Sequence, residues 1–136
     1  MKVLKIYTDG AARGNPGPAA IAYVFIEDNK ILSSDCEYIG EATNNTAEYR
    51  AVLLALKNLK TLQYDLYRFH SDSQLVVNQI NQKWKINKKH LKELYSKVRT
   101  LIKKLPRVEF EYVSRDNINI QKCDSLCNQC LDEKGK

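Results

Sequence analysis

The sequence has no apolar run that approaches the length of a membrane-spanning helix. Residues 1–7 alternate apolar and polar side chains, as a strand does, and they lack the apolar stretch of a secretory signal. Internal repeats, low-complexity segments and linker-like stretches are absent as well. These absences argue against a membrane protein, a repeat protein and a secreted protein. We therefore predict one domain over residues 1–136, located in the cytoplasm and, for want of any oligomer signal, a monomer.

Cysteine and histidine are too sparsely placed to suggest a zinc site or a disulfide framework. Three of the four cysteines, Cys123, Cys127 and Cys130, are spaced to fall on one helical face. A zinc site would need a fourth ligand, and no histidine or paired-cysteine motif lies near them in the sequence. A disulfide framework is not expected in an intracellular chain of this size. We therefore interpret these cysteines as small apolar side chains on a core-facing stripe.

Acidic residues are nearly missing from one basic segment, residues 83–104. The segment holds nine lysines and arginines against one acid, Glu93, whereas the whole chain has a net charge of +6. The remainder of the chain is therefore slightly acidic. Such a segment is typical of a solvated helix face, and equally of a surface that grips the phosphates of a polyanion. The segment alone does not decide between the two interpretations.

The apolar periodicity predicts five strands and four helices in the order β-β-β-α-β-α-α-β-α. Residues 28–30 form a hairpin turn, Thr43 or Asn44 caps the first helix, and Pro106 ends the third. This order predicts an α/β fold in which an antiparallel meander of three strands is extended by two parallel strands, with helices on both faces. The predicted strands are residues 2–8, 19–26, 31–39, 67–71 and 107–113, and the predicted helices are residues 45–60, 73–81, 88–104 and 121–131.

Four acidic residues are each predicted at the end of a strand or the start of a helix, namely Asp9, Glu48, Asp72 and Asp124. Each has a plain structural explanation, because acids are favoured as N-caps and in the first turn of a helix. All four together are harder to explain in this way. Carboxylates that converge at one edge of a sheet raise each other's pKa unless a cation sits between them, and a hard ion such as Mg²⁺ prefers oxygen ligands. The sequence therefore predicts a metal-dependent enzyme.

Five short blocks carry these acids and the Gly-rich loop between the first two strands. They are Thr-Asp-Gly-Ala at residues 8–11, Gly-Asn-Pro-Gly at 14–17, Thr-Asn-Asn-Thr-Ala-Glu-Tyr at 43–49, Ser-Asp-Ser-Gln-Leu-Val at 71–76 and Cys-Asp-Ser-Leu-Cys-Asn at 123–128. In this order and spacing the blocks resemble type 1 ribonuclease H over nearly the whole chain. The resemblance implies a ribonuclease H-like fold. It also implies an endonuclease that hydrolyses the RNA strand of RNA/DNA hybrids, leaving 5′-phosphate and 3′-hydroxyl ends, with little sequence specificity.

By this resemblance, the four acids would be the catalytic residues and would hold two Mg²⁺ ions, for which Mn²⁺ is a possible substitute, with Asp9 bridging both. One ion would lower the pKa of the attacking water, and the other would stabilise the departing 3′-oxygen. Glu48 would also accept a hydrogen bond from the ribose 2′-hydroxyl beside the cut, the group that separates RNA from DNA.

The resemblance also implies positions that contact the hybrid. Asparagine and glutamine side chains would lie in the minor groove, where their donors and acceptors bind sugars and base edges without demanding one sequence. Thr43 would contact a DNA phosphate. Trp84 would pack on a deoxyribose, although a lone tryptophan is equally typical of a local core anchor. The residues implied to bind substrate are Gly10, Asn15, Thr43, Asn44, Asn45, Gln74, Trp84, Lys85 and Lys88.

The chain departs from the family pattern at three places. The loop at residues 114–122 has no histidine, whereas many members carry one there that is thought to assist proton transfer or product release. Residues 83–90 are short where many members insert an extra basic helix, so hybrid binding is expected to be weaker and more sensitive to salt. Glu41 stands where the family often has an arginine in a DNA-phosphate pocket, and an acid there would repel phosphate.

Two other functions share these features. A nucleic-acid-binding module on the same fold would bind without cutting, but it would have no need of four clustered carboxylates. A DNA-processing nuclease of the transposase type would cut DNA, but residues 14–17 and 43–45 match positions that contact a hybrid's minor groove. We therefore expect a ribonuclease acting on hybrids.

Overall fold

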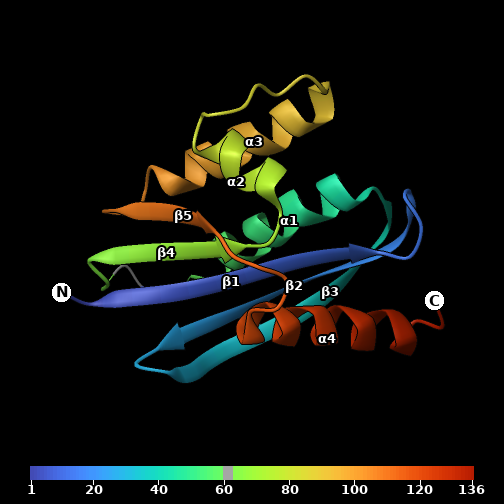
Figure 1. The fold of residues 1–136 in the computed structure, drawn as a ribbon, viewed down its shortest axis with the longest axis horizontal. Coiled ribbons are helices and arrows are strands. Elements are labelled where there is room, and N and C mark those ends of the chain that lie inside the picture. The colour runs from blue at the N-terminus through green and yellow to red at the C-terminus, as the bar shows by residue number, and fades with distance from the viewer. Residues whose placement is uncertain (60–62) are drawn as a thin grey trace.

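The computed structural model describes residues 1–59 and 63–136, and these form one five-stranded sheet and four helices (Figure 1). The strand order is β3-β2-β1-β4-β5, in which β1–β2 and β2–β3 are antiparallel and β1–β4 and β4–β5 are parallel. The predicted α/β fold with a mixed sheet is confirmed. The strands are β1 (Val3–Ala12), β2 (Gly17–Glu27), β3 (Lys30–Ala42), β4 (Leu66–Ser71) and β5 (Val108–Tyr112); the helices are α1 (Asn44–Lys57), α2 (Gln74–Ile80), α3 (Lys89–Ile102) and α4 (Ile118–Glu133).

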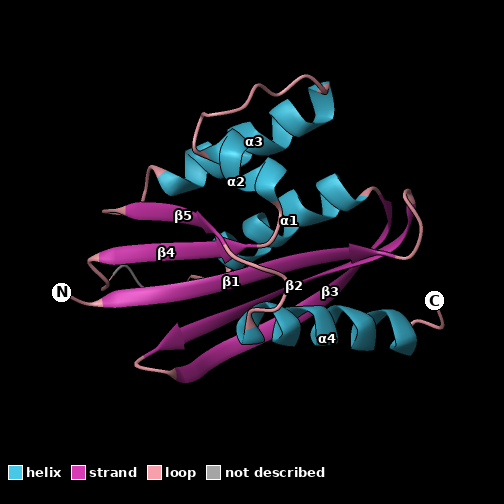
Figure 2. Cartoon of the chain, in the orientation of Figure 1, coloured by secondary structure: helices cyan, strands magenta, loops and turns pink. Residues whose placement is uncertain are grey.

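The sheet separates two apolar layers, because successive side chains of a strand point to opposite faces. Ile6 of β1 packs with α1, α2 and α3 in the larger core cluster. Its neighbour Tyr7 packs on the other face with the buried Cys123 and Cys127 of α4. Figure 2 shows α4 alone across one face of β1, β2 and β3, with the other three helices gathered on the opposite side. The prediction of helices on both faces is therefore confirmed.

Turn and cap residues set the element boundaries much as the sequence predicts. Asp28 and Asn29 have φ angles of 50° and 65°, the left-handed conformation that a two-residue hairpin turn needs. Thr43 caps α1, because its side chain accepts a hydrogen bond from the backbone N–H of Thr46. The predicted end of this helix, Lys60, lies outside the described residues.

The predicted positions of Asp9 and Glu48 within their elements are wrong. Strand β1 does not end at Thr8 but continues to Ala12, because its whole second half pairs with β2, so Asp9 lies inside a strand. Helix α1 begins at Asn44, which places Glu48 in its second turn. Asp72 directly follows β4, as predicted, and its plain explanation as an N-cap does not apply, because the cap of α2 is Ser73.

Helix α4 begins at Ile118, three residues before its predicted start. The Asn117 side chain accepts hydrogen bonds from the backbone N–H groups of Asn119 and Ile120, and this cap adds a turn. Asp124 is consequently the seventh residue of the helix, not a residue at its start. This position directs it from the body of α4 toward the neighbouring elements.

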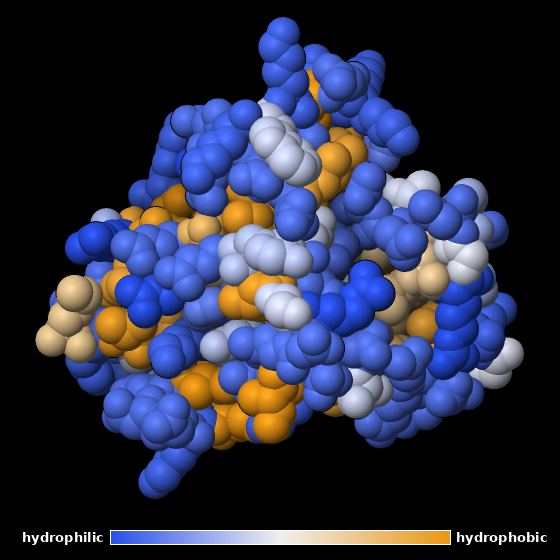
Figure 3. Space-filling model, in the orientation of Figure 1, coloured by the Kyte–Doolittle hydropathy of each residue, from blue (hydrophilic) through white to orange (hydrophobic). Residues whose placement is uncertain are grey.

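The surface is mostly hydrophilic in the view of Figure 3, with an apolar patch toward the β2–β3 hairpin and the start of α4. Ile31 and Ile118, which flank this region, are 48% and 66% exposed. The cysteine interpretation is confirmed for Cys123 and Cys127, which are buried, whereas Cys36 and Cys130 are half-buried. Among the described residues, no helix combines the length and apolar character needed to cross a membrane.

Candidate active site

Three carboxylates from three neighbouring elements meet at one end of the sheet. Asp9 comes from the middle of β1, Glu48 from the second turn of α1, and Asp72 from the residue after β4. Each offers a carboxylate oxygen, and these oxygens all lie within 4.8 Å of one another. Because β1 and β4 are adjacent parallel strands, their carboxyl ends lie at the same edge of the sheet, and the side chains there are neighbours.

Gly10 allows β1 and α1 to approach closely enough for this meeting. A Cβ atom built at Gly10 would lie 2.7 Å from the backbone nitrogen of Glu48 and closer still to the Ala47 carbonyl group. The Gly10 N–H donates a hydrogen bond of 2.7 Å to Oε1 of Glu48. Strand and helix backbones are therefore in contact here, and any side chain larger than hydrogen would separate Asp9 from Glu48.

The environment of these carboxylates disfavours their charged forms. Burial, followed by the negative charges of Asp72 and Asp124, raises the pKa of Asp9 to about 8. The pKa of Glu48 is likewise raised well above its ordinary value, first by burial and then by the charges of Asp9 and Asp72. Asp9 and Glu48 also share a side-chain hydrogen bond, which requires a proton between them. Without a cation, the cluster therefore retains protons near neutral pH.

Asp72 has an oxygen that nothing else in the described structure satisfies. Its Oδ1 atom is buried and, among the described residues, makes no hydrogen bond. Its Oδ2 atom faces the exposed guanidinium of Arg115, with Nε at 3.7 Å. A buried oxygen without a partner is costly, and a divalent cation beside it would remove that cost. The donor set of three carboxylates thus fits a hard divalent metal ion.

Asp124 lies at the rim of the same cavity but outside the group of three. Its Oδ2 atom accepts a hydrogen bond of 3.3 Å from the Asn128 side chain, one turn along α4. The Asn128 Oδ1 atom accepts from Arg13 at 3.2 Å, and Arg13 forms an ion pair of 2.9 Å with Asp132. Asp124 is therefore held by the side-chain contacts that join α4 to the β1–β2 loop.

The four predicted acids line one cavity of about 710 Å³. Of the nine residues predicted to bind substrate, Gly10, Asn44 and Asn45 also line it. Its full lining comes from β1, the start of α1, the β4–α2 junction, the loop into α4 and α4 itself. The cavity is lined by Asp9, Gly10, Ala11, Ala12, Asn44, Asn45, Glu48, Asp72, Ser73, Arg115, Asp116, Ile120, Gln121 and Asp124.

Other predicted contact residues bind backbone groups beside the cavity. The Asn15 Oδ1 atom accepts from the Asn44 backbone N–H at 3.0 Å, and the Asn44 Oδ1 atom accepts from the Ala12 backbone N–H at 3.3 Å. Thr43 is occupied as the α1 cap. These side chains therefore fix the β1–β2 loop against the start of α1, which shapes the rim of the cavity.

The remaining predicted contacts lie around α2 and α3 and are not part of the cavity lining. Gln74 is exposed on the first residue of α2, and Trp84, 47% exposed, stands between α2 and α3 beside the exposed Lys85 and Lys88. The buried Gln79 holds this segment, because its Nε2 atom donates to the Lys85 carbonyl oxygen at 3.1 Å. The basic surface is thus a separate region attached to the same core.

Sequence reasoning missed Arg115, which brings a positive charge into the cavity from the loop that lacks a histidine. The signal was present as a basic residue nine positions before Asp124. Neither histidine lines the cavity in the described part of the chain. His70 stacks on Tyr7 at 4.3 Å between ring centroids, and burial lowers its pKa, so it is neutral near pH 7.

Comparisons with known proteins agree with this arrangement. The profile of the family described as Reverse transcriptase-like matches residues 7–130. The chain is 36% identical over 128 residues to Ribonuclease HI of Halobacterium salinarum, an alignment that covers 93% of this chain and 63% of the relative. It is 37% identical over 153 residues to Ribonuclease H of Clostridium botulinum, with 98% of both chains covered. The chain thus spans less than two thirds of the length of the Halobacterium relative. It spans 36% of the length of a related Mycobacterium tuberculosis protein.

Solved structures show the same fold. The crystal structure of RNase H1 from Halobacterium salinarum superposes with a TM-score of 0.90 at 35% identity, over 96% of this chain and 98% of that one. LC11-RNase H1, solved in complex with an RNA/DNA hybrid, superposes with a TM-score of 0.91 at 34% identity, over 98% and 99% of the two chains. Profile, sequence and fold lead to one conclusion: the chain belongs to the type 1 ribonuclease H family.

Proposed function

We propose that this protein is an endoribonuclease that hydrolyses the RNA strand of RNA/DNA hybrids, leaving 5′-phosphate and 3′-hydroxyl ends. The observation that carries the proposal is the convergence of Asp9, Glu48 and Asp72 within 4.8 Å, with Asp124 at the rim of the same cavity. The relatives named ribonuclease H and the hybrid-bound neighbour structure support the substrate.

We propose Mg²⁺ as the cofactor, in two ions, with Mn²⁺ as a substitute. Asp9, Glu48, Asp72 and Asp124 would hold the ions. When bound, they would activate the attacking water and neutralise charge on the departing 3′-oxygen. The raised pKa values of Asp9 and Glu48 support this assignment, because a cation between these groups would release their shared proton and relieve their repulsion.

The chain's own residues would position the hybrid around the reacting phosphate. Glu48, fixed by the Gly10 N–H, would accept a hydrogen bond from a ribose 2′-hydroxyl. Arg115 would meet a phosphate group at the cavity mouth, since its side chain is 91% exposed there. Asn44 and Asn45, which line the cavity, would contact the minor groove together with Asn15 and Gln74.

The basic surface between α2 and α3 would hold the DNA strand. Trp84, Lys85 and Lys88 are exposed on this segment, and Thr43 would contribute at the start of α1. Because exposed lysines bind phosphates through counterion release, affinity for hybrid should fall steeply as salt rises. Affinity that barely changes between low and moderate ionic strength would contradict this part of the proposal.

One assay separates this function from a binding module and from a DNA nuclease. The purified chain is offered labelled RNA/DNA hybrid, double-stranded RNA and double-stranded DNA, first with Mg²⁺ and then with EDTA. We expect cleavage of the hybrid alone, which EDTA and the substitution Asp9→Asn both abolish. Binding without cutting would favour the binding module, and cutting of DNA would favour a DNA-processing nuclease.

We also propose that residues 1–136 act as a single domain, which is supported by the single sheet that contains all the described strands. The monomeric state and the cytoplasmic location stay predictions. Size-exclusion chromatography with light scattering tests the first of these, and a mass of two chains would contradict it.

A further inference from the structure

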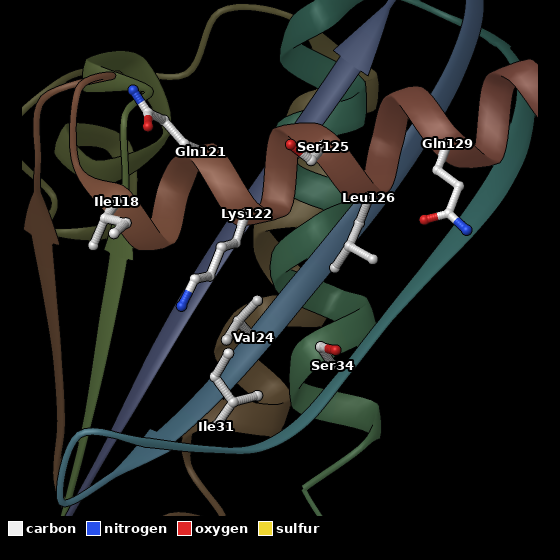
Figure 4. Close-up of a pocket in the computed structure, with 9 residues that line it drawn as sticks. All are labelled: Val24, Ile31, Ser34, Ile118, Gln121, Lys122, Ser125, Leu126 and Gln129. Atoms are coloured by element: carbon white, nitrogen blue, oxygen red, sulfur yellow. The ribbon is translucent and has the colours of Figure 1, made fainter.

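Helix α4 packs alongside the edge strand β3, and residues of the two elements lie opposite one another at regular intervals. Ser34 of β3 lines a groove of about 460 Å³ together with Leu126 and Gln129 of α4. Figure 4 shows Leu126 extending from the helix toward the strands below it. Further along, Nζ of Lys134 lies 5.9 Å from the centroid of the Tyr38 ring. Ser34 and Tyr38 therefore bracket a stretch of β3 that α4 follows from Leu126 to Lys134.

This register places Cys130 opposite Cys36. Two residues of a strand rise about 6.6 Å, and four residues of a helix rise about 6 Å, so the two elements stay in step over this distance. Cys36 is midway between Ser34 and Tyr38 on the same strand face, and Cys130 is midway between Leu126 and Lys134 on the same helix face. Both cysteines pack against the buried cluster under α4, and both are half-buried.

The chemistry of Cys36 agrees with this placement. Its pKa is raised to about 12, first by burial and then by a side-chain hydrogen bond with Cys130 and by the charge that Cys130 carries when ionised. Two thiols that face each other from elements already packed together meet the main geometric requirement of a disulfide, because neither element has to move. The raised pKa keeps Cys36 mostly protonated, so reaction with an oxidant is slow and needs prolonged exposure.

We propose that Cys36 and Cys130 form an oxidation site, at which a small disulfide oxidant links β3 to α4 through an intramolecular disulfide. One cysteine thiolate attacks a sulfur of the oxidant, forms a mixed disulfide and releases one thiol. The other protein thiolate then attacks the cysteine sulfur of that mixed disulfide and releases the second thiol. In total, the two protein thiols lose two protons and two electrons, and the oxidant is reduced to two thiols.

A soft metal does not explain the pair as well. Within the described ranges, one group of three possible metal ligands has its donor atoms close together. That group is Asp9, Glu48 and Asp72, and it does not include the cysteines. The two cysteines therefore lack the third and fourth ligands of a zinc site. A disulfide needs only the two sulfurs.

The disulfide would be a long-range cross-link, because it joins positions 36 and 130 and closes most of the chain into one loop. Such a link restricts the unfolded chain strongly, and we expect the melting temperature to rise by roughly 5–15 °C. Because the thiols are already neighbours, α4 should keep its place on the sheet. Hybrid cleavage should therefore change by less than about twofold, within the usual effect of surface changes.

The test treats the purified chain of residues 1–136 with glutathione disulfide and then determines the intact mass, the non-reduced peptide map and the melting temperature. We expect the mass of two hydrogens to be lost, a peptide pair joined through Cys36 and Cys130, and a higher melting temperature that dithiothreitol reverses. The peptide map needs no variant, so it remains decisive even if a substitution impairs folding.

The matched controls are Cys36→Ser and Cys130→Ser, each of which should stop at a glutathione adduct without a rise in melting temperature. A wild-type protein that also stops at the adduct, or that resists oxidation while folded, would overturn the proposal. So would a cross-link through Cys123 or Cys127. These outcomes are independent of nuclease activity and leave the proposed function untouched.

Discussion

Two parts of the candidate active site are built in different ways. Asp9 lies in β1, Glu48 in α1 and Asp72 directly after β4; the backbones of β1 and α1 are in contact at Gly10, and β4 pairs with β1. Asp124 belongs to α4 on the other face of the sheet, and its contacts run through polar side chains, the half-buried Asn128 and the exposed Arg13. The first three carboxylates are gathered by backbone packing, and the fourth is positioned by polar side chains.

This difference has a physical consequence for how firmly each carboxylate is held. Backbone contacts in a close-packed core leave little freedom, so the group of three is nearly preformed. A side-chain hydrogen bond at the surface contributes little net free energy, because water competes for both partners. We therefore expect substitutions in the group of three to act on catalysis and stability together, and substitutions around Asp124 to act mainly on metal use.

The largest expected effect comes from removing a carboxylate of the group of three. Glu48→Gln should lower the cleavage rate by about 10³-fold or more, whereas Asp124→Asn should lower it by roughly 10- to 100-fold. Single-turnover cleavage of labelled hybrid at saturating Mg²⁺ measures both. Equal losses in the two variants would show that the fourth carboxylate is held as firmly as the others.

The close approach at Gly10 should make Gly10→Ala the most destabilising small substitution in this region. The added Cβ meets the backbone of Ala47 and Glu48, which cannot rotate away, so we expect a loss of about 2–4 kcal/mol in the free energy of unfolding. Urea denaturation measures this loss. Glu37→Ala on the exposed edge strand β3 is the control and should change the free energy by less than about 0.5 kcal/mol.

Without metal, stability should fall as pH rises. The pKa of Asp9 is raised from 3.8 to about 8, so the folded state binds a proton that the unfolded state has released between those values. The free energy of unfolding should therefore be highest near pH 4 and fall toward pH 8, by on the order of a few kcal/mol. Thermal melts in EDTA check this slope. Mg²⁺ should flatten it, and a slope of the opposite sign would refute the assignment.

Removing the support of Asp124 should have the smallest effect. Asn128→Ala deletes the amide that holds the Asp124 carboxylate, and we expect a several-fold higher Mg²⁺ concentration for half-maximal cleavage, with nearly unchanged stability. Gln129→Ala, the exposed neighbour, is the matched control. Cleavage measured against Mg²⁺ concentration tests this, and identical curves for both variants would show that the Asn128 contact does not matter.

Much of this fold followed from local sequence signals. Residues 28 and 29 predict a tight hairpin turn because asparagine and aspartate tolerate left-handed conformations, and Thr43 predicts a cap because its hydroxyl satisfies a free N–H. The errors fell where long-range pairing overrides local pattern. β1 continues past Asp9 because β2 pairs with it as far as Ala12. The residues around Asp9 do not show this pairing in their local sequence pattern.

The candidate site shows the same division. The four acidic residues stand out in the sequence, but the role of Arg115 and the Arg13–Asn128 contact arise only from packing between distant segments. A loop arginine has no local feature that reveals which carboxylate it will face. Asn15 and Asn44, expected to contact substrate, also hold the loop to the helix, and only the folded chain shows that second role.

By itself, the sequence determined the α/β class, the order of elements and the four acids, because apolar periodicity and turn chemistry act over a few residues. The tertiary structure alone decided that three of those acids share a buried corner while Asp124 stays at its rim, and that Cys36 lies opposite Cys130. Such distances depend on how β1, α1, β3 and α4 pack, and packing is settled by contacts between residues far apart in the chain.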